Sequence, residues 1–305
     1  MNAMGEQPLV LDFDGSVGVP PGAAVLPLAH WQQRIRFGCT LRSMAALRHA
    51  LTAGLPADPG PVFTGSGDFH HVSLLLIERL AERGPLDVIV LDNHPDNMRY
   101  PWGIHCGSWV SHVAALPFVR HVQVMGIGSS DVTLRHALEN RLLPLLRGRL
   151  SYWCVGNAIG WARHVGLGSA MRNFDSAGAM LQAFAEQQAG SRRPVYLSVD
   201  KDVLSTRVAR TNWDQGELRE SHVVEVVSLL ARRLAGCDIT GDVSAAHYTA
   251  RWKRWLSAID AQPAAGGVEL LRWQAEQQAL NARLLQALAA CSPAPDGRAG
   301  PNNED

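Results

Sequence analysis

The feature that most constrains the fold of this chain is an alternation of short apolar runs with longer amphipathic stretches. Seven runs have the length and the apolar, β-branched composition of buried strands, at 8–13, 61–65, 86–92, 119–127, 149–155, 194–199 and 237–243. Four amphipathic stretches between them are long enough for three or more helical turns, at 41–53, 71–83, 175–189 and 220–234. This rhythm predicts an α/β fold with three layers, α/β/α, around a mainly parallel sheet.

Length and composition favour a single domain. A chain of 305 residues can bury a large core without disulfides, and the sequence contains no repeat or linker-like segment. We therefore expect one domain over residues 1–291, with a last helix at about 268–290. Residues 292–305 are rich in Pro, Gly and Asn, which is typical of a flexible tail.

The charge balance disfavours some classes of partner. The chain has 28 Lys and Arg residues against 28 Asp and Glu residues, and no basic stripe of the kind that binds nucleic acid or an anionic membrane. Its five cysteines form no C-x-x-C pair, which is typical of reduced thiols. No apolar stretch is long enough to span a membrane or to form a signal peptide. We expect a cytoplasmic protein that acts on a small molecule.

Potential metal ligands gather where three of the predicted strands end. Segment 64–71 reads TGSGDFHH, segment 88–96 reads VIVLDNHPD, and segment 196–202 reads YLSVDKD. In open α/β sheets, ligands and catalytic groups collect beyond the carboxyl ends of the strands. The three segments are therefore expected to contribute to one site.

Spacing within the second and third segments predicts that their ligand side chains converge. Residues two apart along a strand share a face, so Lys201 should face away while two sets can each point to one place: Asp92, His94 and Asp96, and Asp200 with Asp202. These carboxylates would repel one another strongly unless cations lay between them. Oxygen-dominated ligation with a few imidazole nitrogens suits Mn²⁺ best, with Fe²⁺, Co²⁺ and Zn²⁺ as alternatives. The ligands exceed the needs of one ion, which indicates two ions per chain.

Some of these residues also have a simpler interpretation. Asp and His at strand ends often cap the following helix, and a lone D-x-D is weak evidence for a metal. Asp68 precedes a predicted helix, and for this residue capping is the better interpretation. The D-F-D-G segment at 12–15 is interpreted as a structural turn.

The ordered set G-x-G-D-F-H, D-N-H-P-D and S-V-D-K-D resembles the ureohydrolase family of arginases, agmatinases and formiminoglutamases. The motifs of that family run G-G-D-H, D-A-H-x-D and S-x-D-x-D in the same order. The resemblance covers roughly residues 61–243 and is specific in its second and third motifs. It implies an arginase-like fold, two manganese ions per chain and a homo-oligomer.

The resemblance also implies a role for each ligand, carried over by motif position. Asp92 and Asp200 would bridge the two ions. His94 and Asp202 would complete the coordination of one ion. Asp96 and a histidine of the first motif would complete the other.

Two histidine assignments rest on shorter matches. Phe69 separates Asp68 from the histidines of the first motif, a departure from the family; we favour His70 as the ligand, with His71 as the alternative. Downstream, the segment 103–107, GIHCG, looks like the short N-x-H-G segment of the family, whose histidine is regarded as a proton shuttle. His105 is the candidate for that role.

Other departures bear on the substrate. The late strand of the family usually ends in a glutamate that holds the guanidinium of the substrate. Here the corresponding region offers Asp238 and Asp242, which should share a strand face, and no Glu. Asp242 is the candidate anchor for a cationic substrate group. The acid–proline turn after D-x-D and the asparagine-rich loop of arginases are also missing, which disfavours a conventional arginase.

The expected function is a binuclear manganese-dependent hydrolase of a non-peptide C–N bond in a small guanidino, amidino or formimino compound. A water that bridges two ions becomes hydroxide near neutral pH and can attack a trigonal carbon. Asp200 or Asp202 would accept a hydrogen bond from this nucleophile, and His105 would deliver a proton to the leaving group.

Two alternatives stay open. A zinc-dependent deacetylase of related architecture would need one ion and fewer carboxylates. A non-catalytic member of the family would bind metal in a regulatory role. A calcineurin-like metallophosphoesterase is disfavoured, because its motifs occur in another order.

Overall fold

The computed structural model describes residues 4–245, 248–250, 253–254 and 267–291. Within these residues a nine-stranded sheet has the order β2-β1-β4-β11-β10-β5-β7-β8-β9, and its neighbouring strands are all parallel. The strands are β1 (Leu9–Asp12), β2 (Ala24–Pro27), β4 (Val62–Gly65), β5 (Leu86–Leu91), β7 (Val119–Ile127), β8 (Leu150–Val155), β9 (Met171–Phe174), β10 (Val195–Asp200) and β11 (Leu234–Thr240). The central position of β10, between β5 and β11, brings the ends of these three strands together.

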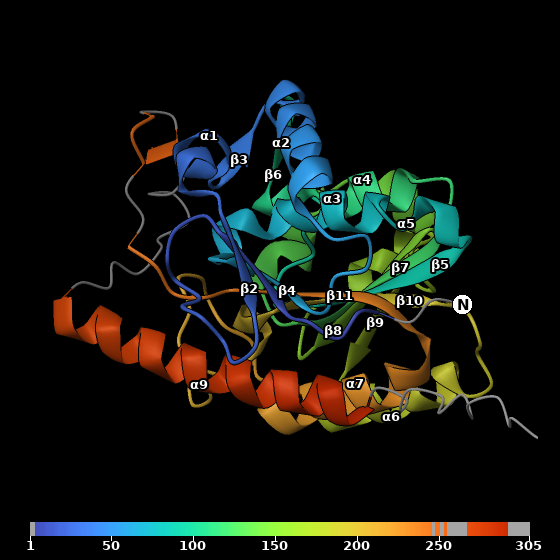
Figure 1. Cartoon of the computed structure of the whole chain (residues 1–305). Helices are drawn as coiled ribbons and strands as arrows, with labels where there is room; N and C mark the ends of the chain where they lie inside the picture. The colour runs from blue at the N-terminus through green and yellow to red at the C-terminus, as the bar shows by residue number, and fades with distance from the viewer. Residues whose placement is uncertain (1–3, 246–247, 251–252, 255–266, 292–305) are drawn as a thin grey trace, which may run out of the picture.

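Helices cover both faces of this sheet (Figure 1). One face carries α1 (Gln32–Ile35), α2 (Leu41–Gly54), α3 (Ser73–Glu78), α4 (Val110–Ala115) and α5 (Leu142–Leu146), and the other carries α6 (Ala177–Gln188), α7 (Glu220–Leu230) and α9 (Gly267–Cys291). A separate antiparallel pair consists of β3 (Gly38–Cys39) and β6 (Ile104–His105). The predicted three-layer α/β/α architecture is confirmed.

Short 3₁₀ helices fill many of the connections: η1 (Ala29–Trp31), η2 (Gly67–Val72), η3 (Ala81–Arg83), η4 (Cys106–Ser108), η5 (Ser130–Val132), η6 (Leu134–His136), η7 (Gly160–Val165), η8 (Lys201–Val203) and η9 (Ala231–Arg233). Two of them, η2 and η8, directly follow the strands β4 and β10. They therefore begin at the carboxyl edge of the sheet, where the predicted ligands lie.

Two hydrophobic cores lie on the two faces of the sheet. In β5, Val88 and Val90 pack into the core that contains α2, α3 and α4, whereas Ile89 and Leu91 pack into the core that contains α6, α7 and α9. Successive strand side chains point to opposite faces, and here both faces are covered by helices. This double burial explains why the strands read as continuous apolar runs.

Most predicted elements are present, with shifts at their ends. The last helix, predicted at 268–290, is α9, whereas the stretch predicted as one helix at 71–83 divides into parts of η2, α3 and η3. Strands β2 and β9 were not predicted, because they are four-residue edge strands with partly exposed side chains. The proposed tail at 292–305 lies outside the described residues.

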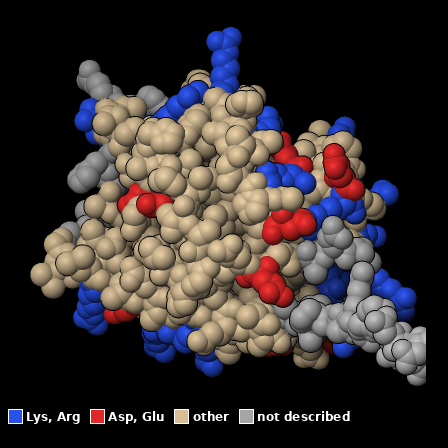
Figure 2. Space-filling view, in the orientation of Figure 1, with Lys and Arg blue, Asp and Glu red and all other residues tan. Residues whose placement is uncertain are grey.

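The surface carries charges of both signs. On the face shown in Figure 2, Lys and Arg lie in scattered groups beside Asp and Glu, and most of the face is uncharged. Among the described residues, no helix has both the length and the apolar character required to cross a bilayer.

Candidate metal centre

The structure brings together all four ligands proposed for the first ion, with three carboxylates around one histidine nitrogen. His70 Nδ1 lies 3.3 Å from Asp92 Oδ2, 3.0 Å from Asp96 Oδ2 and 3.2 Å from Asp200 Oδ2. All four side chains are buried. The cluster joins η2 to the ends of β5 and β10, as the sequence predicts.

A second group adjoins the first and shares Asp92 with it. His94 Nδ1 lies 3.1 Å from Asp202 Oδ2 and 3.6 Å from Asp92 Oδ1. The two oxygens of Asp92 therefore face different histidines. In each of the two sets, His70–Asp92–Asp200 and Asp92–His94–Asp202, one ligand atom per residue lies within 4.8 Å of the others, so each set could hold a metal ion.

The convergence of the second motif does not arise from strand alternation. Strand β5 ends at Leu91, and beyond it the backbone N–H of His94 donates to Asp92 Oδ1 at 2.7 Å. Asp96 has a φ of 45°, a left-handed conformation that is rare outside glycine. A turn, rather than the period of two that we assumed, therefore directs Asp92, His94 and Asp96 toward the centre.

A turn also shapes the third motif. Strand β10 ends at Asp200 and η8 follows at once. The carboxylate of Asp200 accepts a hydrogen bond from the backbone N–H of Asp202 at 3.1 Å, which holds the two acids side by side. Lys201 lies between them in the sequence, and its fully buried side chain forms an ion pair with Asp242.

The first motif corrects the capping interpretation of Asp68. The side chain of Ser66 caps η2 by accepting the backbone N–H of Asp68. The Asp68 carboxylate instead accepts Arg36 Nε at 2.7 Å and the hydroxyl of Tyr248 at 2.9 Å. The capping residue is therefore Ser66, two residues earlier than predicted, and the carboxylate of Asp68 is instead paired with the buried Arg36.

The same motif places its two histidines differently. His70 reaches both the carboxylates and β10, whereas His71 belongs to neither ligand set within the described residues. Burial, together with the nearby His105, lowers the pKa of His71 to about 3, so its imidazole is neutral at neutral pH. Of the two alternatives, only His70 belongs to a group of described residues that could hold a metal ion.

The charges of the centre are strongly coupled. Burial opposes a charged His70, but its contacts with Asp200, Asp92 and Asp96 outweigh burial and raise its pKa well above the ordinary value. Burial and the neighbouring Asp92 raise the pKa of Asp96 to about 7. Burial and the neighbouring Asp200 and Asp92 raise the pKa of Asp202 well above its ordinary value. Packed carboxylates therefore favour added positive charge, from protons or from metal ions.

The residues fit divalent cations. Within the part of the chain that the structure describes, His70 Nδ1 and Asp92 Oδ2 are buried atoms without a hydrogen-bond partner, and buried polar atoms rarely lack one. The donor set consists mainly of carboxylate oxygens with two imidazole nitrogens, which suits Mn²⁺ and related ions. An ion at each ligand set would satisfy these atoms and neutralise the carboxylates.

Comparisons with known proteins bear on the fold. No family model matches the sequence. An uncharacterised protein from Thermotoga maritima is 25% identical over 195 residues, which are 62% of this chain and 60% of that protein, so the match spans less than two thirds of the relative's length.

Solved structures match over more of the chain. Proclavaminate amidinohydrolase from Streptomyces clavuligerus is 18% identical, with a TM-score of 0.52 over 94% of this chain and 93% of its own. A formiminoglutamase variant from Trypanosoma cruzi, solved with Mn²⁺, is 12% identical, with a TM-score of 0.51 over 89% of this chain and 76% of its own. The chain has the ureohydrolase fold.

Two residues that contact the candidate metal ligands were not predicted from the sequence. Asp214 Oδ1 lies 2.7 Å from Nε2 of His94, and its side chain is 69% exposed. Trp109 Nε1 donates to Asp96 Oδ2 at 2.7 Å, and its ring lies 4.7 Å from that of His70. Neither residue lies in a motif, so the sequence contained no signal for them.

His105 lies near the centre without joining it. Its ring stacks on Phe37 at 5.9 Å, Phe37 stacks on Trp213 at 6.2 Å, and Trp213 lies 6.0 Å from the ring of His94. Burial lowers the pKa of His105 to about 4, and its Nδ1 accepts the backbone N–H of Gly107. The neutral ring therefore carries its proton on Nε2. Its catalytic role stays a prediction.

The structure argues against Asp242 as the anchor of a cationic substrate. Asp242 is fully buried, with Oδ1 2.6 Å from Lys201 Nζ and 2.9 Å from the amide of Asn281. Asp238 instead contacts Tyr196 and Ser198, so the two acids do not share a face. The reason is that β11 ends at Thr240, and the next residue is a glycine with a φ of 91°.

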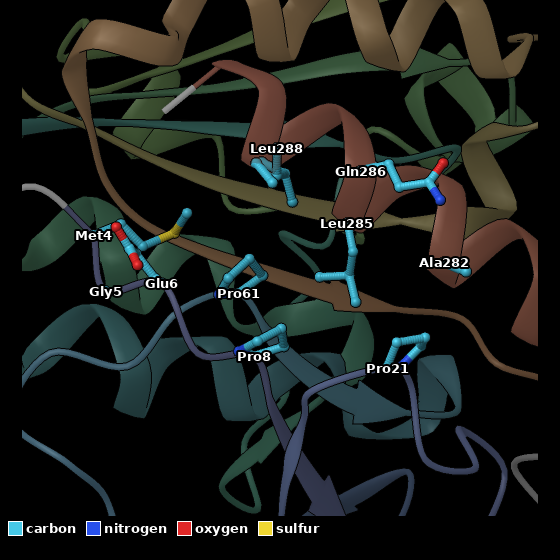
Figure 3. A pocket seen from close by; sticks show the side chains of 11 residues that line it. Met4, Gly5, Glu6, Pro8, Pro21, Pro61, Ala282, Leu285, Gln286 and Leu288 are labelled. Carbon is cyan, nitrogen blue, oxygen red and sulfur yellow. The ribbon is translucent and has the colours of Figure 1, made fainter. Parts of the chain in front are cut away.

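An apolar cavity of about 360 Å³ lies elsewhere in the molecule (Figure 3). It lies between the N-terminal segment and α9, with Pro8, Pro61 and Leu285 in its lining. Pro8 and Pro61 directly precede β1 and β4, so the cavity lies at the amino edge of those strands. The ligand cluster lies at the opposite, carboxyl edge, and the cavity is not part of it.

Proposed function

We propose that this chain is a divergent ureohydrolase, a binuclear manganese-dependent hydrolase of a non-peptide C–N bond. The observation that carries the proposal is the shared carboxylate of Asp92, which faces His70 with one oxygen and His94 with the other. Two overlapping ligand sets are the arrangement that a pair of ions with a common bridge requires. The ureohydrolase fold of the chain supports the same interpretation.

The proposed substrate class is compatible with the chemistry of such a centre. When bound, two ions supply Lewis-acid activation of water near neutral pH. Asp202, next to the exposed side of the centre at His94, can accept a hydrogen bond from the attacking water. His105 offers an N–H at Nε2 toward a leaving amine. We propose a small guanidino, amidino or formimino compound as the substrate.

The first test is metal content together with a product screen. Protein prepared with Mn²⁺ is assayed by elemental analysis, and urea and ammonia release are measured for a panel of guanidino, amidino and formimino compounds. We expect two ions per chain and turnover of at least one compound. One Zn²⁺ per chain would instead favour a deacetylase, and two ions with no turnover would favour a non-catalytic member of the family.

A substitution tests the shared ligand. Because Asp92 belongs to both ligand sets, we expect Asp92→Ala to lose both ions rather than one. The measurement is bound metal per chain by elemental analysis after gel filtration. Asp175→Ala, which removes an exposed acid after β9, serves as the control and should retain two ions. Retention of both ions in Asp92→Ala would refute the shared-ligand assignment.

A further inference from the structure

Behind the metal centre, hydrogen bonds link His70 to three further buried side chains, Ser198, Asp238 and Tyr196. Nε2 of His70 lies 2.9 Å from the hydroxyl of Ser198. This hydroxyl donates to Asp238 Oδ1 at 2.7 Å, and the hydroxyl of Tyr196 donates to Asp238 Oδ2 at 2.5 Å. All four residues are at most 2% exposed, so water does not compete for these hydrogen bonds.

The sheet places these residues with little freedom. Ser198 and Asp238 are register partners on the neighbouring strands β10 and β11. Tyr196 lies two residues before Ser198 and therefore on the same face. His70 reaches them from η2, which follows β4 on the other side of β11. These hydrogen bonds join three elements, η2, β10 and β11, and do not depend on one flexible loop.

The direction of the hydrogen bonds follows from the donors available. An ionised carboxylate can only accept, and Asp238 accepts from both hydroxyls. Ser198 has one proton, which it donates to Asp238, so its oxygen must accept from His70. The proton of a neutral His70 therefore lies on Nε2. Its Nδ1 then presents a lone pair to the carboxylate cluster.

This direction matters because Nδ1 is the nitrogen that faces the other ligands. Nδ1 lies within 3.3 Å of three carboxylates, from Asp92, Asp96 and Asp200. Only a deprotonated nitrogen can coordinate a metal ion. Partners on the outer nitrogen of a ligating histidine fix its tautomer and its orientation.

We propose that Asp238, acting through Ser198, is a positioning residue that sets the tautomer of His70 for metal coordination. The inference rests on the proposed metal centre and assigns a role to a residue that the motifs left without one. The hydrogen-bonded path from Asp238 to His70 passes through the serine hydroxyl, and the charges of Asp238 and His70 also interact directly.

The same logic separates Asp238 from Asp214. Asp214 contacts the outer nitrogen of His94 directly and is largely exposed, so water can replace it. Asp238 is fully buried. Burial raises its pKa because loss of hydration makes the charged form less stable. A nearby positive group stabilises the negative charge of Asp238, and a cation bound at His70 would be such a group.

Metal affinity in a double-mutant cycle tests the proposal. Zn²⁺ binding is measured by calorimetry for the wild type, Ser198→Ala, Asp238→Asn and the double variant. Loss of an outer partner typically weakens metal affinity about 10- to 100-fold, and we expect this loss in Ser198→Ala with a smaller one in Asp238→Asn. In the Ser198→Ala background, Asp238→Asn should have a much smaller effect than in the wild type, since its hydrogen-bonded path to His70 is already removed.

A spectroscopic readout separates positioning from general destabilisation. In Zn²⁺-loaded protein with ¹⁵N-labelled histidine, long-range ¹H–¹⁵N spectra report which ring nitrogen is protonated, and His70 is assigned by its absence in His70→Gln. The wild type should show the proton on Nε2. Ser198→Ala should lose this single state, whereas Asp14→Asn, which alters another carboxylate whose side chain is only 2% exposed, should retain it.

The outcomes distinguish this inference from the proposed function. If the wild type binds two ions and Ser198→Ala binds them with equal affinity and the same tautomer, the positioning role is wrong and the metal centre stands. Additive losses in the cycle would also overturn it, because Asp238 would then act independently of Ser198. If the wild type binds no divalent ion, the proposed function itself fails, and this inference fails with it.

Discussion

Asp96 shows how a single residue of the centre is held in an unfavourable conformation. Its left-handed backbone, with a φ of 45°, costs a non-glycine residue on the order of 1 kcal/mol. The indole N–H of Trp109 donates to its carboxylate, and the ring of Trp109 also packs against His70. The strain therefore persists because the surrounding contacts specify the position of the carboxylate, as is common at functional sites.

His105 leads to a prediction about stability and pH. Burial lowers its pKa from 6.5 to about 4 in the folded state. Between these values the unfolded chain binds more protons than the folded chain, so the free energy of unfolding falls as the pH falls. We expect His105→Gln to remove about 1.4 kcal/mol of this loss per pH unit within the window.

The measurement is urea unfolding of the wild type and the variant at several pH values between these two limits. His164→Gln, which replaces an exposed histidine, is the control and should follow the wild type. Identical pH dependence in wild type and His105→Gln would show that His105 titrates normally in the folded protein.

At the scale of elements, a group of three buried polar side chains, Lys201, Asp242 and Asn281, connects α9 to η8 beside the candidate ligands. Lys201, in η8, forms a buried ion pair with Asp242 and donates to Asn281 of α9. Asn281 also donates to Asp242. Because Lys201 lies between Asp200 and Asp202, this group connects the packing of the last helix to the backbone that presents two ligands.

We predict that removing one charge of this group is worse than removing the whole group. Lys201→Met leaves Asp242 buried without its cation, and losing one partner of a buried pair typically costs about 3–5 kcal/mol. The triple variant Lys201→Met/Asp242→Leu/Asn281→Leu replaces all the polar atoms with apolar ones and should be less destabilised. Chemical denaturation of both variants measures the difference. A triple variant at least as unstable as Lys201→Met would contradict the expectation.

At the scale of the whole molecule, metal binding at the carboxylate cluster would be coupled to folding. Four acids approach one another at the carboxyl edge of the sheet, where the unfolded chain would keep them apart: Asp92, Asp96, Asp200 and Asp202. Cations that bind only the folded state stabilise it by mass action. The net charge of zero therefore does not describe this edge of the sheet, where four acids are concentrated.

We expect Mn²⁺ to raise the unfolding temperature of chelator-treated protein. An ion present at 100 times its dissociation constant adds about 2.7 kcal/mol to the free energy of unfolding. Calorimetry with and without Mn²⁺ measures the shift, and Asp92→Ala is the control that should show none. The expectation fails if Mn²⁺ leaves the wild-type transition unchanged.

Much of the architecture could be predicted because apolar periodicity is local. The strands at 86–92 and 119–127 and the helix at 268–290 were recognisable from side-chain patterns within a few turns. Edge strands such as β2 and β9 were not, because half-exposed residues leave no continuous apolar run. The end of β11 at Thr240 was also missed, since the pattern does not reveal where a glycine redirects the chain.

Local patterns in the sequence were enough to predict the long buried strands, most of the helices and the three segments that carry the candidate ligands, because these depend on neighbouring residues. The tertiary contacts show which histidine of the first motif faces the acids, and that Asp238 contacts Ser198 while Asp242 pairs with Lys201. Those outcomes depend on contacts between residues far apart in the chain, such as His70 with Ser198 and His94 with Asp214. The physical reason is that a hydrogen bond requires a partner at a particular distance and direction, and packing alone sets both.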